Sequence, residues 1–435
     1  MLGPDEPRPR SSRATAAVLA STSVTTLWLV ARPHIGASAG TALLVAAIAA
    51  FLVARRARPG PRAVVACTAI AMTVAVVLQP FGSRDVWSYI AYGHIVVDHR
   101  ANPYLVAPAA FPEDPTTARV APGWRSTPTV YGPAFTGASA TIAAISRGSL
   151  TAERRLHQAM AAACSVMIAG VLWQRRRSLD GFMLLGLNPA ALAIVNGGHN
   201  DLLVGALVSA GAWATARRHA VAGGALIGLA ASVKVIALIT LLVVLLQPRQ
   251  GRARTAGAAL GVTALGYLLV GGPSAVAPLL DAGGMTSRAA VWSGPRAVAA
   301  AAWGEERAGT IVAVAAAVAI VAFGSAAARR RARQDGATAM ATTLGGTTAL
   351  LPYTLPWYSG WGLAVAGSST DATTRSWVLA ESLVLLAAYA VPPGTAPPPL
   401  IGTVGALLLP LLITAGVAAW VLAARRSKTE LRGLS

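Results

Sequence analysis

The chain has 435 residues, of which 55% are hydrophobic and 12% are charged, and its mean hydropathy is +0.58. Because a soluble protein carries roughly 25% charged residues, this composition and the repeated apolar runs predict an all-α, polytopic membrane protein. The net charge of +20 does not indicate a nucleic-acid partner, since the basic residues stand in short clusters between apolar runs, where they orient helices.

Cysteine and motif content narrow the function further. Cys67 and Cys164 both lie inside apolar segments, which indicates neither a disulfide framework nor a metal site. A P-loop, GxGxxG, HExxH or GxSxG motif does not occur in a convincing context, and a DxD motif is absent. We therefore expect no metal and no cofactor, and the sequence argues against nucleotide-driven transport, zinc proteolysis and serine hydrolysis.

The apolar runs predict one membrane domain over residues 15–424, with about fourteen transmembrane helices. Residues 1–14 are expected to form a disordered cytoplasmic segment, and residues 425–435 a cytoplasmic tail. The predicted spans are 15–32, 36–54, 62–79, 157–173, 181–197, 201–216, 219–233, 235–247, 255–272, 308–327, 338–354, 357–369, 376–391 and 400–424.

Basic clusters select the topology. If the apolar segment 131–146 is re-entrant or lies at the interface, all the clearest clusters fall on one side of the membrane. The positive-inside rule then predicts a plasma-membrane protein with cytoplasmic termini and a large first outer-face loop at 80–156. The clusters are at 8–13, 55–62, 175–177, 217–218, 249–254, 329–333 and 425–428.

Several arginines fall on the outer face in this topology, against the positive-inside bias. An anionic ligand such as a phosphate would explain them, and solvated loop charges are the alternative. These arginines are Arg84, Arg100, Arg119, Arg125, Arg288 and Arg296.

Asp85 opens the outer-face loop where a hydrophobic helix ends. Partial burial beside a cation, Arg84, would leave this carboxylate ionised and able to take a proton from a sugar hydroxyl. The alternative is an N-cap for a helix over 86–97, because Asp is favoured at that position. The helix carries aromatic side chains, including Tyr89, and is predicted to be amphipathic and to lie on the outer surface.

The rest of the loop has an ordered pattern, with NPY at 102–104 and many prolines. Asn102 and Tyr104 belong to this pattern, and Tyr131 is a candidate to line the site. Asp114 could pair with a loop arginine or bind substrate, and the structural role is favoured.

Polar residues also interrupt the later apolar runs. The GGHND sequence places His199, Asn200 and Asp201 between two spans, where ionisable groups are expensive unless they are used. Substrate contact is favoured over a satisfied helix-end pair. Lys234, near the outer end of a span, either extends to the interface or binds a phosphate.

The PWYSGW turn at 356–361 contains Trp357 and Tyr358. These side chains suit an interfacial aromatic belt and also stacking on a sugar face, and the sequence does not separate the two roles.

Together these motifs resemble the GT-C glycosyltransferases that use polyprenyl-phosphate sugars. The similarity is greatest to actinobacterial polyprenol-phosphate-mannose-dependent α-1,6-mannosyltransferases, which build the mannan backbone of lipomannan. The chain has DVWSY where the family usually has DVYSY. The motifs are DVWSYIAYG (85–93), NPY (102–104), TPTVYGP (127–133), GGHND (197–201), ASVK (231–234) and PWYSGW (356–361).

The resemblance implies an inverting transfer of mannose from a β-linked mannosyl phospholipid to a glycolipid or mannan acceptor. Membrane lipids are the other expected partners. Asp85 would be the general base. The implied contacts to the donor phosphate and sugar are Arg84, Tyr131, His199, Asn200, Asp201 and Lys234. The implied acceptor or sugar-stacking contacts are Tyr89, Asn102, Tyr104, Trp357 and Tyr358. The alternatives are transfer of arabinofuranose or glucose from the corresponding donor, and a lipid or solute transporter.

Overall fold

The computed structural model describes residues 11–176, 178–247, 250–331 and 335–390. These residues form helices and connecting segments with no strand, as the composition predicts. The predicted span 400–424 and the predicted tail 425–435 lie outside the described residues, as do residues 1–10 of the N-terminal segment.

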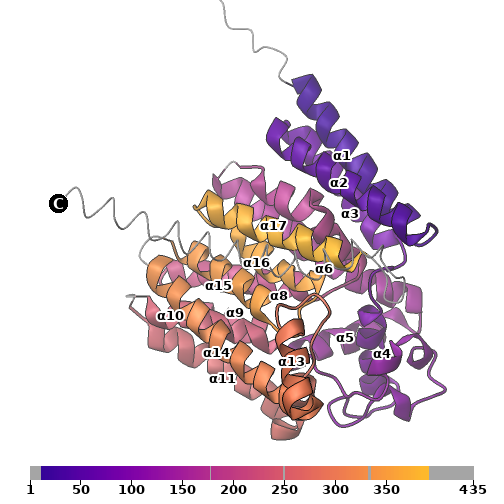
Figure 1. Ribbon diagram of the computed structural model, residues 1–435, viewed down its shortest axis with the longest axis vertical. Helices are drawn as coiled ribbons and strands as arrows, with labels where there is room; N and C mark the ends of the chain where they lie inside the picture. Colours follow the sequence, from indigo (N-terminus) through magenta and orange to yellow (C-terminus); the bar gives the residue numbers. More distant parts are fainter. Residues whose placement is uncertain (1–10, 177, 248–249, 332–334, 391–435) are drawn as a thin grey trace, which may run out of the picture.

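Most of the α-helices are joined by short connections, and the loop 98–132 between α4 and α5 is the long exception among the described residues (Figure 1). They are α1 (Ser11–Ala31), α2 (Ala37–Ala57), α3 (Pro61–Val77), α4 (Asp85–Val97), α5 (Pro133–Ser146), α6 (Leu150–Arg176), α7 (Pro189–Asn196), α8 (Asp201–Ala216), α9 (Ala220–Ala231), α10 (Leu241–Leu246), α11 (Arg252–Val270), α12 (Ala277–Ala282), α13 (Ser293–Trp303), α14 (Glu305–Arg331), α15 (Gly336–Leu350), α16 (Ser359–Ala366) and α17 (Ala372–Tyr389).

In the part that the structure describes, five helices are long and apolar enough to cross a membrane, which is consistent with a membrane protein. These are Ser12–Ala31, Ala37–Ala57, Leu150–Gln174, Arg252–Val270 and Glu305–Arg330. A sixth span results if α7 and α8, which are bent by 114° at their junction, count as one. The expected number of fourteen and the GT-C fold therefore stay predictions.

Other predicted spans form shorter helices. The run 235–247 becomes a 3₁₀ segment, Val235–Thr240, followed by α10, and the run 181–197 becomes a π-helical turn, Phe182–Leu187, followed by α7. Hydropathy does not reveal these breaks, because a helix interior to a bundle can end early when neighbouring elements satisfy its backbone.

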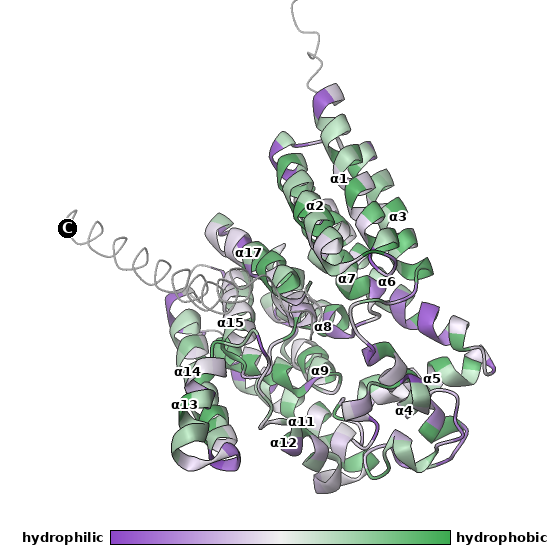
Figure 2. Ribbon diagram, turned by 45° about the vertical axis from the view of Figure 1, so that its right-hand side comes forward, coloured by the Kyte–Doolittle hydropathy of each residue, from purple (hydrophilic) through white to green (hydrophobic). Residues whose placement is uncertain are grey.

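The helices enclose the ends of α4, α9 and α16, where the candidate site lies. Helices α1, α2 and α3 pack together at one end of the molecule, and α4 packs on α5 with the loop 98–132 around them (Figure 1). Figure 2 shows hydrophobic colour over most of α2 and α3, and mixed colours around α4 and α5.

The prediction that the helix after Asp85 lies on the surface was wrong. Most of α4, from Val86 to Ile95, is buried. The helix approaches α5 so closely that a Cβ on Gly93 would stand 2.6 Å from the carbonyl oxygen of Ser139. The loop after α4 folds back over the helix, an arrangement that aromatic content alone does not reveal.

The segment before α5 docks on the end of α9. The N–H of Gly132 donates to the carbonyl of Val233 (3.0 Å), and the N–H of Ala134 donates to that of Ser232 (2.8 Å). These bonds place Tyr131 next to Lys234 on the wall of one cavity. The loop 98–132 and α9 are therefore joined at the site.

We expect Gly132→Ala to destabilise this junction, because the added Cβ would stand 2.3 Å from the carbonyl oxygen of Ser232. Overpacking against backbone costs about 1–3 kcal/mol, so the melting temperature in detergent should fall by about 1–3 °C. Gly137→Ala is the matched control, because its Cβ would meet no atom within 4 Å. Equal melting temperatures for the two variants would contradict the close docking.

Candidate active site

A cavity of about 230 Å³ lies where the start of α4, the segment after α9 and the PWYSGW turn meet. Its polar lining includes Asp85, Ser88, Tyr92 and Lys234. Aromatic side chains form much of the remaining wall and include Trp124, Tyr131, Tyr353, Trp357, Tyr358 and Trp361. One carboxylate and one ammonium among aromatic rings suit a polar ring-shaped ligand that carries an anionic group.

Asp85 is the first residue of α4, and its side chain caps no helical N–H. Its own N–H donates to Ser83 Oγ (3.0 Å), so the predicted alternative, an Asp85 cap, is not what the structure shows. The carboxylate lines the cavity with 24% of its side chain exposed, and its Oδ2 lies 3.6 Å from His199 Nδ1. It is therefore accessible to a ligand.

Burial raises the pKa of Asp85 to about 6, against the smaller lowering effects of a hydrogen bond with Ser83 and the charge of Lys234. The sequence analysis expected Arg84 to be the cation that keeps Asp85 ionised. That prediction was wrong, because Arg84 is exposed and does not line the cavity. The effective cation comes from Lys234, which is distant in sequence. A carboxylate that titrates near 6 is a better general base than an ordinary aspartate and is still ionised at neutral pH.

Lys234 points into the protein, which excludes the predicted alternative of an interfacial anchor. Its Nζ donates to Asp201 Oδ1 (2.8 Å), and Asp201 is fully buried. The ammonium lies 4.2 Å from the ring centroid of Tyr358 and 5.3 Å from that of Trp361. Only 16% of the lysine side chain is exposed, so its charge faces the cavity with little competition from solvent.

The three polar side chains of the GGHND sequence, at positions 199–201, point in different directions. The sharp bend needs a positive φ of 64° at Gly198, which glycine adopts without strain. His199 stacks on Trp357 with ring centroids 4.0 Å apart, and Asp201 holds Lys234. Asn200 is fully buried, lines neither this cavity nor the next, and its amide atoms have no hydrogen-bond partner among the described residues.

A second cavity, of about 240 Å³, lies on the other side of the stacked pair of His199 and Trp357. Its polar lining includes Ser83, Asn196 and Tyr389. Trp357 and Leu355 line both cavities, so the two cavities are neighbours. Asp85 lines only the first cavity, and His199, which lines the second, has its Nδ1 3.6 Å from Asp85 Oδ2.

The other predicted ligand contacts divide into two groups. Tyr131 lines the first cavity, and Tyr89 packs behind it in an edge-to-face contact with ring centroids 4.9 Å apart. Asn102 and Tyr104 lie away from both cavities. The Asn102 amide donates to the carbonyl of Val270 (2.7 Å), and the Tyr104 hydroxyl donates to that of Tyr131 (2.9 Å), so both residues fasten the loop.

Sequence analysis missed Ser88 and Tyr92 as site residues. With Asp85 they stand at i, i+3 and i+7 of α4, which places all three on one helical face. That spacing could have identified them. The segment that contains Leu279 and Met285 gave no comparable signal, because its apolar side chains join the cavity only through the fold.

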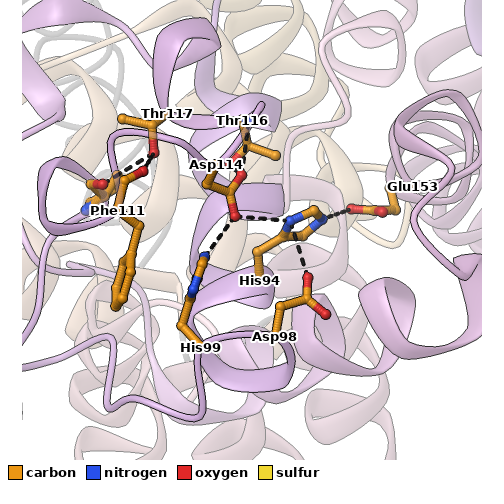
Figure 3. A network of polar contacts seen from close by, with 9 residues as sticks. His94, Asp98, His99, Phe111, Asp114, Thr116, Thr117 and Glu153 are labelled. Carbon is orange, nitrogen blue, oxygen red and sulfur yellow. Dashed lines mark hydrogen bonds and ion pairs between the residues drawn. The ribbon is translucent and has the colours of Figure 1, made fainter.

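A network of ionisable groups holds the loop on α4 (Figure 3). Asp114 Oδ2 accepts hydrogen bonds from His94 Nδ1 (3.2 Å) and His99 Nε2 (2.8 Å), and its Oδ1 accepts two from Thr116. His94 Nε2 contacts Glu153 Oε2 on α6 (3.0 Å). The predicted structural role of Asp114 is confirmed, but its charged partners are His94 and His99 and not the expected loop arginine. The network fixes the helix that begins at the candidate base.

The charges of this network stabilise one another. Burial alone would lower the pKa of His94, but hydrogen bonds to Asp114 and Glu153 and their negative charges raise it to about 10. Burial raises the pKa of Asp114, but the bonds from His94 and Thr116 outweigh this and hold it well below its usual value. In the described part of the chain, no group of three or more His, Cys, Asp and Glu residues has the geometry to hold a metal ion.

Comparison with known proteins gives a consistent result. Residues 8–249, more than half of the chain, match the family model described as alpha-(1→6)-mannopyranosyltransferase, N-terminal domain. The chain is 30% identical over 187 residues to alpha-(1→6)-mannopyranosyltransferase A of Corynebacterium glutamicum, covering 40% of this chain and 36% of that protein. It is 31% identical over 186 residues to the protein of the same name from Mycobacterium tuberculosis, covering 40% and 35%. The matches thus span about a third of the length of these relatives.

The His94 network predicts a particular dependence of stability on pH. Because the folded pKa of His94 is raised to about 10, its stabilisation is complete below the unfolded value, roughly 6.5, and is lost as the pH rises towards 10. The melting temperature should therefore fall across this alkaline interval, and His94→Gln should lower it most at the neutral end. His219→Gln, at an exposed position, is the control. The same alkaline slope in His94→Gln and wild type would contradict the assignment.

Proposed function

The chain belongs to the alpha-(1→6)-mannopyranosyltransferase family, and on that premise we propose that it transfers mannose from a polyprenyl-phosphate-mannose donor to an α-1,6-mannan acceptor. The observation that carries the proposal is one cavity that is lined by a candidate base, Asp85, and by a cation, Lys234.

In this proposal the donor occupies the first cavity. Its phosphate lies near the Lys234 ammonium, and its sugar lies against the aromatic wall that includes Tyr131 and Tyr358. Asp201 does not contact substrate; it orients Lys234 through the 2.8 Å ion pair. Negative charge develops on the departing polyprenyl phosphate in the transition state, and the ammonium stabilises it there.

The acceptor enters from the second cavity, beyond the ring of Trp357. Its hydroxyl reaches Asp85, which removes the proton as the oxygen attacks the anomeric carbon. The new carbon–oxygen bond forms on the face opposite the breaking bond to phosphate, so a β-linked donor gives an α-linked product. Asp85 ends protonated, and polyprenyl phosphate leaves as the anion.

We further propose that the site faces the outside of the plasma membrane. The basic cluster at 55–62 lies at one end of α3 and Asp85 lies just past the other. A helix of 17 residues separates them by roughly 25 Å, close to the thickness of the hydrocarbon core. If the basic end is cytoplasmic, the cavity opens at the outer surface.

The direct test incubates membranes with labelled polyprenyl-phosphate-mannose and an α-1,6-oligomannoside. Wild type should elongate the acceptor, and Asp85→Asn should reduce the rate by roughly 10²–10⁴ because the general base is lost. Asp281→Asn, which makes the same change at an exposed position outside the cavity, should retain activity. Activity of Asp85→Asn within a few-fold of wild type would remove Asp85 from the mechanism.

Lys234 should affect the donor more than the acceptor. Lys234→Gln alone would leave Asp201 buried without its cation, which costs roughly 3–5 kcal/mol, so the cleaner variant is Lys234→Gln with Asp201→Asn. We expect this double variant to raise KM for the donor at least about tenfold and to leave KM for the acceptor nearly unchanged. Lys234→Arg should retain only part of the donor affinity, because the guanidinium fork is wider than an ammonium group. An unchanged donor KM in the folded double variant would contradict a phosphate contact.

A further inference from the structure

Another cavity, of about 340 Å³, lies beside the proposed site and has no part in the proposed transfer. The segment 286–288, one face of α13 and the start of α14 line it. Its polar lining consists of two arginines, three hydroxyl side chains and one carboxylate. They are Arg288, Arg296, Thr286, Ser287, Ser293 and Glu305.

Helix α13 divides into a cavity face and an apolar face. Ser293, Arg296 and Ala300 line the cavity at i, i+3 and i+7, which places them on one side of the helix. On the opposite side of the helix, Val298 is 72% exposed. Helix α13 packs against α14, a helix long and apolar enough to cross a membrane, and the first residue of α14, Glu305, lines the cavity. The cavity therefore lies at the end of a candidate membrane span, at the level of lipid head groups.

Two polar side-chain atoms of the lining have unsatisfied hydrogen-bonding capacity among the described residues. Arg296 Nε and Thr286 Oγ1 are buried and have no hydrogen-bond partner among the described residues. The terminal Nη2 of Arg296 contacts Glu305 Oε2 at 3.0 Å, but Glu305 is 74% exposed, so this surface pair holds the arginine weakly. A buried donor without an acceptor is unfavourable, and an anionic oxygen in the cavity would satisfy it.

Arg288 connects this cavity with the proposed acceptor side. Its guanidinium lies 4.8 Å from the ring centroid of Tyr389, which lines the second cavity. The N–H of Ser287 donates to the carbonyl of Pro352, which lines the first (2.9 Å). The arginine cavity is thus a neighbour of both.

We propose that this cavity binds the phosphate of an anionic lipid. Guanidinium groups bind phosphate oxygens bidentately, and the unpaired hydroxyl of Thr286 supplies a further donor. The place of the cavity at the end of a candidate membrane span favours a lipid phosphate over a soluble one. The phosphate belongs either to a phospholipid of the bilayer or to a phosphodiester anchor of the acceptor. The binding itself does not depend on the proposed transfer.

The test measures lipid retention by the purified full chain in native mass spectrometry, with phosphatidylglycerol against phosphatidylcholine. Wild type should retain the anionic lipid at least about tenfold better, and Arg288→Gln with Arg296→Gln should abolish the preference. Arg307→Gln, which removes an exposed charge of α14 outside the cavity, should keep it. If the double variant has a lowered melting temperature, the single variants Arg296→Lys and Thr286→Val are used in its place. Each is expected to weaken retention of the anionic lipid in part.

A preference that survives in the double variant, or one that Arg307→Gln removes equally, overturns the proposal. A short mannoside on a phosphodiester lipid then identifies the source. Its displacement of phosphatidylglycerol from wild type assigns the cavity to the acceptor anchor, and no displacement assigns it to the bilayer. If wild type did not transfer mannose, the proposed function would be contradicted, but the result of the lipid measurement would still stand.

Discussion

The ion pair between Lys234 and Asp201 is the interaction on which the site depends. Its atoms are 2.8 Å apart and the carboxylate is fully buried, so neither charge can be removed alone without a large loss of stability. The pair fixes an ammonium against Tyr358 and Trp361 on the wall of the cavity that Asp85 also lines. A buried pair of this kind contributes less to stability than to orientation, which is what a phosphate ligand needs.

Two backbone features bring the parts of the site together around this pair. The corner at Gly198 bends the chain by 114°, so His199 can stack on Trp357 while Asp201 faces Lys234. The docking of the loop on the end of α9 then carries α4 and its first residue, Asp85, to the same cavity. Elements far apart in sequence thus supply the base and the cation. The His94 network holds α4, the helix that begins at the base.

The sequence identified the all-helical membrane architecture and the main chemical groups, because hydropathy and unusual polar residues are local signals. It did not identify their partners. Arg84 adjoins Asp85 in sequence but is exposed, whereas Lys234 acts on Asp85 through the fold. Asn102 and Tyr104 belong to a recognisable motif but fasten the loop, since a motif does not say where its side chains point. The predicted spans 181–197 and 235–247 are interrupted in the structure, because apolar runs continue through helix breaks that packing decides.

The central claim is that Asp85 acts as the base with a proton affinity set by burial and by Lys234. The pH dependence of kcat/KM for mannosyl transfer by wild type tests it most directly. The account predicts an acidic limb with an apparent pKa of about 6 and a plateau above it. A limb at the ordinary carboxylate value of roughly 4, or a flat profile between about pH 5 and 8, would contradict it.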